Sequence, residues 1–297
     1  MTAAPSGQGR LVLVGTPLGN ASDLSPRAAK AIEEADVVAC EDTRHTRKLL
    51  AAAGLTTTGK LLSLHQHNEA ARAGELVERI SAGATVVVVT DAGMPGVSDP
   101  GERMVRAALD AGLQVDVVPG PTAVTSALAI SGLPTSRFAF DGFLPRKGKA
   151  RTSALDAIAT EQRTTVLYEA PHRLEATVGD LLAALGPDRR IAIAREMTKL
   201  FEEVWRGTLA EAATHTREVA PRGEYTLVVE GAPPMEPASD DAVEAAVRRH
   251  LASGLSRKDA AAAVAAETHV SKRAAYLVAN RVAATSSTHD SQITRPL

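Results

Sequence analysis

Residues 90–101 have the sequence TDAGMPGVSDPG and separate two segments of different pattern. The preceding run TVVVV (85–89) is typical of a strand that is buried on both faces, whereas apolar residues recur at helical spacing over 102–111. In a parallel sheet, such a strand-to-helix loop lies at the carboxyl edge, where ligands bind. Its glycines permit close backbone approach, and its prolines restrict its shape. A tight connection without function could share these residues, and the GxGxxG and GxxxxGK(S/T) patterns of nucleotide-binding loops do not occur.

The same order of strand, loop and helix recurs along residues 10–123. We expect one helix to start at Pro26, since proline is favoured at the first helical position, and Asp42 to cap the next. The repetition predicts an α/β domain with a largely parallel sheet. A second series predicts a second α/β domain over 124–232. The strands expected in the two series are 11–14, 36–40, 61–64, 85–89, 115–118, 138–140, 164–168, 190–194 and 225–230.

The pattern becomes helical after an expected linker at 233–238. The pattern of residues 239–285 predicts a helical extension, in which Ser256 and Ser271 are suitable N-caps. Two short helices separated by a few residues resemble a helix-turn-helix, although a small bundle that stabilises a dimer would have the same pattern. The helices expected are 242–253, 257–267 and 272–284.

Bulk composition restricts the class of protein. The formal net charge of −2 gives the chain no general attraction for nucleic acid, so RNA would be held by local basic patches, such as the seven Lys/Arg against two acidic residues over 248–281. The single cysteine, Cys40, excludes an internal disulfide and fits a reducing cytoplasm. No apolar run approaches the length of a membrane span, so we expect a cytoplasmic protein. The composition of 1–9 and 286–297 predicts a disordered leader and a disordered tail.

Ionisable residues gather where the expected strands end. The segments EDTRHTRK (41–48), YEAPHR (168–173) and REMTK (195–199) combine acids and bases that are rarely buried unpaired, so salt-bridge networks and a polar substrate site are both open interpretations. The basic run RKGKAR (146–151) is either a solvated surface or an anion contact. In HQHNE (65–69), two histidines without a clear third ligand favour hydrogen bonding over metal binding, and we expect no metal site.

Seven of these loops together resemble a known family. The segments GTPLGN (15–20), EDTR (41–44), DAGMPGVSDPG (91–101) and PGPTA (119–123) resemble the tetrapyrrole-methylase superfamily. The segments GFLPRK (142–147), YEAPHR (168–173) and REMTK (195–199) narrow the resemblance to the small-subunit ribosomal RNA cytidine 2′-O-methyltransferases. All seven occur in order over about 10–232.

This resemblance implies two α/β domains of the tetrapyrrole-methylase type, with a cofactor cleft between them and a small C-terminal helical domain. It further implies S-adenosylmethionine as cofactor, a cytidine ribose in 16S rRNA of the small ribosomal subunit as acceptor, and a homodimer. Met94 departs from the small polar residue that the family pattern suggests. The cofactor positions that carry over are Leu18, Asp91, Met94, Thr122, Ala123, Tyr168 and Glu169.

The reaction that the resemblance implies needs help in removing a proton, because a ribose hydroxyl is a very weak acid. Ionisable residues of the strand-end clusters are the candidates for this role and for positioning the ribose: Glu41, Asp42, Arg44, Arg173, Glu196 and Lys199. One alternative keeps the fold and changes the acceptor to a tetrapyrrole carbon or a diphthine-type modified histidine. An alternative of another class is a nucleic-acid-binding regulator led by the helix-turn-helix-like extension.

Overall fold

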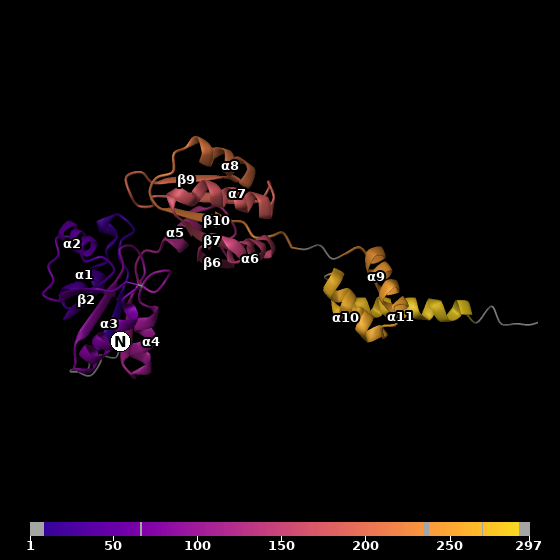
Figure 1. Cartoon of the computed structure of the whole chain (residues 1–297), viewed down its shortest axis with the longest axis horizontal. Helices are drawn as coiled ribbons and strands as arrows, with labels where there is room; N and C mark the ends of the chain where they lie inside the picture. Colours follow the sequence, from indigo (N-terminus) through magenta and orange to yellow (C-terminus); the bar gives the residue numbers. More distant parts are fainter. Residues whose placement is uncertain (1–8, 66, 235–237, 269, 291–297) are drawn as a thin grey trace, which may run out of the picture. The chain divides into compact units, whose positions relative to one another are not determined.

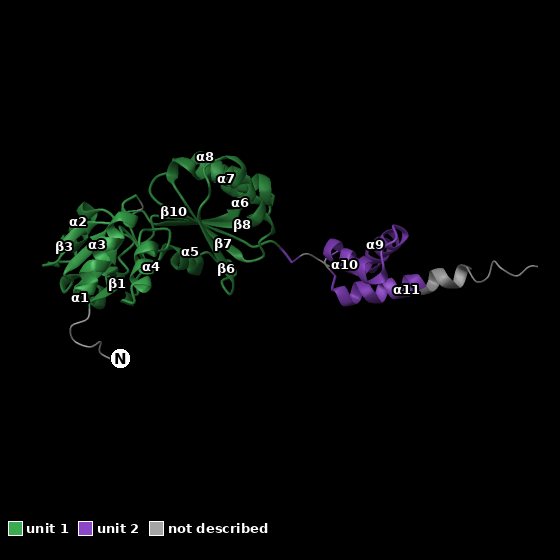
Figure 2. Ribbon diagram, turned by 60° about the horizontal axis from the view of Figure 1, so that its bottom comes forward, with its two compact units in different colours: residues 1–232 green, residues 233–297 purple. Residues whose placement is uncertain are grey.

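The structure is a computed structural model that describes residues 9–65, 67–234, 238–268 and 270–290. The chain divides into two compact units, Met1–Ala232 and Pro233–Leu297, which Figure 2 colours separately. The first unit contains two five-stranded sheets, and the second is helical (Figure 1). The division of α/β and helical structure therefore follows the change of pattern along the sequence.

The first sheet has the strand order β3-β2-β4-β1-β5, and every pairing in it is parallel. The central strand β4 is the valine run, and Val86 to Val89 are all buried there. Alternate residues of the strands feed two core clusters on opposite faces, so helices cover both sides. The elements are β1 (Arg10–Val14), η1 (Ala21–Asp23), α1 (Pro26–Glu33), β2 (Val37–Cys40), α2 (Thr43–Ala52), β3 (Lys60–Ser63), α3 (Glu69–Ser81), β4 (Thr85–Val89), α4 (Glu102–Asp110) and β5 (Gln114–Val118).

The second sheet, of order β6-β7-β10-β8-β9, is mixed: β6 and β7 are parallel, whereas β10 is antiparallel to both of its neighbours and β9 is antiparallel to β8. Helix α5 packs in one core cluster, and α6, α7 and α8 pack in the other. The elements are α5 (Ala123–Ile130), β6 (Phe138–Phe143), α6 (Gly148–Thr160), β7 (Thr164–Glu169), η2 (Pro171–Arg173), α7 (Leu174–Leu185), β8 (Arg190–Arg195), β9 (Glu203–Thr208), α8 (Leu209–Glu218) and β10 (Tyr225–Val229).

Strand β9 and helix α8 were not predicted from the sequence. Strand β9 lies at the sheet edge and has the sequence EVWRGT, in which charged side chains interrupt the apolar alternation. An edge strand buries little on either face, so it lacks the hydrophobic signal on which strand prediction depends. Helix α8 begins with a capping box between Thr208 and Glu211, a signal that the sequence did carry.

The helical unit consists of α9 (Asp240–Ala252), α10 (Arg257–Thr268) and α11 (Lys272–Asp290). The predicted caps are present, because Ser256 Oγ accepts from the Asp259 amide and Ser271 Oγ accepts from the Ala274 amide. Helix α11 continues to Asp290, past the start of the tail that the sequence predicted at 286. The remainder of the predicted tail and residues 1–8 of the predicted leader lie outside the described residues. None of the helices in the described ranges is long and apolar enough to cross a membrane.

Candidate functional site

Three strand-end loops of the first sheet are fixed to one another by backbone contacts. The Thr16 amide donates to the Gly93 carbonyl at 2.9 Å, and the Gly93 amide donates back at 3.1 Å. Gly93 has a φ of +89°, which glycine adopts without a Cβ penalty. A Cβ on Gly120 would lie 2.8 Å from Cα of Gly15, so this approach also requires glycine. The loops after β1, β4 and β5 therefore form one rigid edge.

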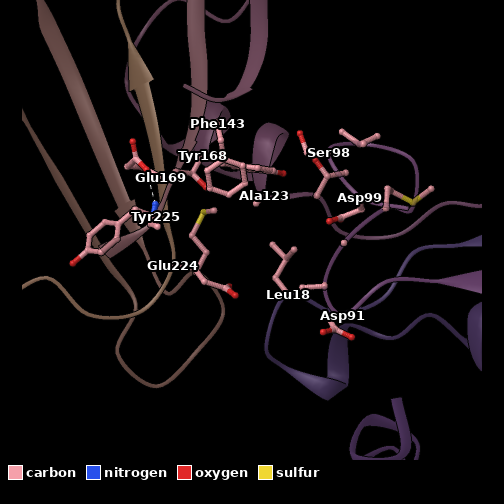
Figure 3. Close-up of a pocket in the computed structure, with 18 of the residues that line it drawn as sticks. Leu18, Asp91, Ser98, Asp99, Ala123, Phe143, Tyr168, Glu169, Glu224 and Tyr225 are labelled. Atoms are coloured by element: carbon pink, nitrogen blue, oxygen red, sulfur yellow. Dashed lines mark hydrogen bonds between the residues drawn. The ribbon is translucent and has the colours of Figure 1, made fainter. Parts of the chain in front are cut away.

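This edge forms one wall of a cavity of about 400 Å³ within the first unit. Figure 3 shows Leu18 and Asp91 on that wall, with Tyr168 and Glu224 across from them on the side of the second sheet. All seven residues that the resemblance implied for the cofactor line this cavity, together with one of the proposed catalytic residues. In sequence order these are Leu18, Glu41, Asp91, Met94, Thr122, Ala123, Tyr168 and Glu169.

The second-sheet wall is largely aromatic and apolar. The ring of Tyr168 lies edge-on to Phe140, with centroids 4.9 Å apart, and 5.6 Å from the ring of Phe143. Burial, together with repulsion from the carboxylates of Asp99 and Glu224, raises the pKa of the Tyr168 hydroxyl to about 12. Phe143 and Met197 add apolar surface to the cavity. This wall is suited to a flat or apolar part of a ligand.

Four carboxylates of the described residues face the cavity with few cationic partners: Glu41, Asp91, Asp99 and Glu224. Burial raises the pKa of Asp99 to about 7, and Glu41, Asp91 and Glu224 contribute to this rise by repulsion. Burial likewise raises the pKa of Glu41, with a further contribution from Asp91. Like charges brought together in a partly desolvated cavity stabilise a cation placed among them. The cavity is therefore built for a ligand with positive charge.

Glu169 lines the cavity, but its carboxylate is already engaged. Its oxygens accept from the Ala170 amide at 2.8 Å and from Thr177 Oγ1 at 2.5 Å, and Arg173 Nε lies 3.3 Å away. Arg173 also donates to the Leu144 carbonyl at 2.6 Å. The two residues therefore hold the loop after β7 against the loop after β6. The structure does not place Arg173 in the cavity lining.

Asp42 and Arg44 lie outside the cavity. Asp42 caps α2 by accepting from the Arg44 amide at 2.7 Å, and the Arg44 guanidinium lies 2.9 Å from the same carboxylate. The hydrogen bonds from Arg44 lower the pKa of Asp42 to about 2. The backbone amide of Asp42 donates to Asp91 at 3.2 Å, so the segment still contacts the site. The Arg44 side chain is 84% exposed, so its pair with Asp42 faces solvent.

Lys199 and Glu196 are joined to the cavity through Glu224. The Lys199 ammonium donates to Glu196 and to Glu224, at 2.9 Å in each case. Glu196 also accepts from the Glu224 amide at 2.9 Å. Glu224 lines the cavity, and a Cβ on Gly19 would lie 2.3 Å from Cγ of Lys199. The cluster thus contacts Glu224 on one wall of the cavity and Gly19, which follows the lining residue Leu18, beside the other wall.

The basic run at 146–151 separates into two kinds of residue. Arg151 is 11% exposed and donates to Asp180 at 2.7 Å and to the Pro145 carbonyl at 2.9 Å, so its role is structural. Lys147 and Lys149 are exposed. The described residues contain no group of three or more His, Cys, Asp or Glu that could hold a metal ion.

Several residues of the cavity lining were not predicted from the sequence. Asp99 lies in the quoted loop 90–101, where its acidic side chain at a strand end was an available signal. Phe143 belongs to the segment GFLPRK and was likewise available. Met197 lies within REMTK, but Glu224 precedes β10 without any motif, and its place at the cavity depends on the turn that brings it against Glu196.

Comparisons with known proteins agree with this geometry. The model for Tetrapyrrole (Corrin/Porphyrin) Methylases matches residues 10–213. A Mycobacterium tuberculosis protein (strain CDC 1551 / Oshkosh) named ribosomal RNA small subunit methyltransferase I is 50% identical over 258 residues, which are 87% of this chain and 90% of the relative. A Synechocystis protein of the same name is 44% identical over 270 residues, covering 90% and 96%.

Solved structures show the same fold. The crystal structure of uroporphyrin-III-C-methyltransferase from Thermus thermophilus superposes with a TM-score of 0.53 at 26% identity, over 75% of this chain and 94% of that chain. Diphthine synthase gives a TM-score of 0.58 at 19% identity, over 74% and 89%. In both cases the similarity covers about three quarters of this chain, which is about the length of the first unit with its two sheets.

Proposed function

We propose that this chain, which belongs to the tetrapyrrole methylase family, methylates small-subunit ribosomal RNA. Its relatives within that family are named ribosomal RNA small subunit methyltransferase I. The proposed reaction is the S-adenosylmethionine-dependent methylation of the ribose 2′-oxygen of a cytidine in 16S rRNA. The observation that carries the proposal is the 50% identity over 258 residues to a relative of that name. We further propose that the protein acts in the cytoplasm as a homodimer.

The cavity fits the proposed cofactor. S-adenosylmethionine carries a sulfonium and an ammonium group, and the carboxylates of Asp91, Asp99 and Glu224 supply the opposite charge. Leu18 and Tyr168 offer apolar surface for the adenine, while the tight backbone at Gly93 leaves room for the cofactor to approach the chain. When bound, this cofactor supplies a methyl group that is activated for attack by an oxygen nucleophile.

We propose that Asp99 accepts the proton of the attacking hydroxyl. A general base works best when its pKa is near the operating pH, and the pKa of Asp99 is raised to about 7. Glu41 is the second candidate, since it lines the same cavity with a raised pKa. Lys199 and Glu196 would then position Glu224 at the rim. Fixing the nucleophile and the methyl group in line supplies part of the rate through orientation.

Arg44 and the exposed lysines of the basic run at 146–151 suit contact with RNA outside the cavity. Arg44 is exposed beside the loop that contacts Asp91, and Lys147 and Lys149 are exposed close to Phe143 in the sequence. Phosphate contacts of this kind position a nucleic acid without reading its bases. In the helical unit, ion pairs join Arg248 to Glu244 and Arg249 to Glu267, so part of its basic charge is already neutralised.

The test is methyl transfer from labelled S-adenosylmethionine to small ribosomal subunits that lack the modification. We expect label in 16S rRNA and 2′-O-methylcytidine after nuclease digestion. Free 16S rRNA should be tested in parallel, because the substrate is either the assembled subunit or the RNA alone. Label found in a tetrapyrrole or in a protein histidine, with none in RNA, would contradict the proposal. Binding of duplex DNA without methyl transfer would favour the regulator.

A further inference from the structure

The loop between β8 and β9 exposes two large apolar side chains at its tip. Leu200 is 89% exposed and Phe201 is 68% exposed. These are the two most exposed large apolar side chains among the described residues. They follow directly after Lys199, whose ammonium bonds to the cavity residue Glu224. Neither side chain serves the core of its own sheet, so the packing of the chain does not explain them.

The loop is held in one shape by its own backbone. The Lys199 amide donates to the Glu196 carbonyl at 3.0 Å, and the Glu202 amide donates to the Lys199 carbonyl at 3.1 Å. Glu196 and Thr198 have φ values of +48° and +67°, which residues other than glycine rarely adopt. The Thr198 amide donates to Glu202 Oε2 at 2.5 Å, which closes the loop. Strained backbone that is maintained in this way is typical of functional sites.

The tip also lies at the right place for a substrate. Lys199 contacts the lining residue Glu224 and packs on Gly19, the neighbour of the lining residue Leu18, so the loop lies beside the cavity. Phe201 is two residues further along, and two residues span at most about 7 Å. In duplex DNA, successive nucleotides of one strand are about 3.4 Å apart along the helix axis, and we take this as the scale of nucleotide spacing in the RNA. A nucleotide with its ribose in the cavity would therefore bring a base within reach of the tip.

We infer that Phe201, supported by Leu200, stacks on a nucleobase of the RNA strand beside the nucleotide that is methylated. The inference rests on the proposed function, and it assigns a substrate contact to a residue outside the cavity lining. Proteins recognise unstacked RNA bases by stacking them on aromatic side chains. The other possible occupant is a second copy of this chain, since the protein is proposed to act as a homodimer. The attachment of the loop to the cavity residue Glu224 through Lys199 favours the RNA, and the oligomeric state is measured as part of the test.

The experiment compares full-length Phe201→Ala and Phe201→Trp with wild type, using labelled S-adenosylmethionine and unmodified small ribosomal subunits. Phe138→Ala is the matched control, since Phe138 is an exposed aromatic residue outside the cavity lining. Loss of one base stack should lower kcat/KM by about 5- to 150-fold in Phe201→Ala, mainly through KM for the subunit. Phe201→Trp should keep most of the activity, and the cofactor Kd from calorimetry should stay the same in all variants.

Four results would overturn the inference while wild type remains active. They are full activity of Phe201→Ala, equal damage in Phe201→Trp and Phe201→Ala, a matching loss in Phe138→Ala, and a fall in cofactor affinity. A shift from dimer to monomer on size exclusion would assign the tip to contact between copies and also overturn it. Failure of wild type to methylate subunits or free rRNA would instead reject the proposed function, and the inference with it.

Discussion

The Asp99→Asn substitution tests whether the cavity concentrates negative charge at a cost to folding. Asp99 has a pKa of about 7 in the folded protein against an ordinary value of 3.8, because it is buried beside Glu41, Asp91 and Glu224. Between these two values the folded state holds a proton that the unfolded chain has already released. Stability from this group therefore falls as the pH rises from about 4 to about 7. Asparagine resembles the protonated carboxyl and removes this dependence.

The size of the effect follows from the same shift. One pKa unit corresponds to 1.36 kcal/mol, so ionising Asp99 in the folded state costs at most about 4 kcal/mol at about pH 8. Near pH 5 the same linkage gives about 1.7 kcal/mol. The stability advantage of Asp99→Asn over wild type should therefore grow by about 2.5 kcal/mol between these two pH values.

The assay is urea unfolding at several pH values, followed by the fluorescence of Trp205, the single tryptophan of the chain. Trp205 lies in the same compact unit as Asp99. Asp110→Asn is the control for loss of one carboxylate, since Asp110 is exposed at the end of α4 and lies outside the cavity lining. A stability difference that stays constant with pH, or a variant that is less stable than wild type near pH 8, would refute the reasoning.

Three further substitutions test the site and its surroundings. Asp91→Asn should weaken S-adenosylmethionine binding by about 10- to 100-fold in calorimetry, because a hydrogen bond to a charged group is lost, and unchanged affinity would remove Asp91 from the cofactor site. Lys199→Met should reduce turnover far more than cofactor affinity, because it releases Glu224 at the rim; equal loss of both would contradict this role. Arg151→Ala should lower the free energy of unfolding by about 2–3 kcal/mol and Lys149→Ala by less than about 0.5 kcal/mol, and the reverse order in urea unfolding would count against a structural Arg151.

The first domain could be predicted well because its signals are local. The valine run of β4 is buried on both faces, and each strand ends in a loop whose composition differs from ordinary connections. In a parallel sheet the carboxyl ends share one edge, so loops distant in sequence are brought together by topology alone. Five of the seven residues assigned to the cofactor from the family resemblance follow strands of this sheet and line one cavity, whereas Tyr168 and Glu169 reach the same cavity from the end of β7 in the second sheet.

The second domain shows where sequence patterns were insufficient. Its strand β10 lies between β7 and β8 in antiparallel pairings, and the sequence of alternating strands and helices does not reveal this order. The basic run at 146–151 appeared uniform, but Arg151 folds inward to Asp180 while its neighbours stay exposed. Whether a basic side chain points inward or toward solvent depends on the partner that the tertiary structure places near it. A run of basic residues in the sequence does not show which of them will have such a partner.

The charge of the cavity illustrates the same limit more sharply. A formal net charge of −2 over 297 residues gives no indication of where charge gathers in the folded chain. The fold nevertheless collects Asp91 and Asp99 from one loop, Glu41 from another and Glu224 from the opposite sheet around one space. Each is an ordinary carboxylate in isolation, and the raised pKa of Asp99 arises only from their meeting and their burial. A cavity of that charge attracts a cation and repels phosphate, so the proposed function requires the RNA backbone to be held outside the cavity, by exposed cations such as Arg44, Lys147 and Lys149, while only the ribose enters.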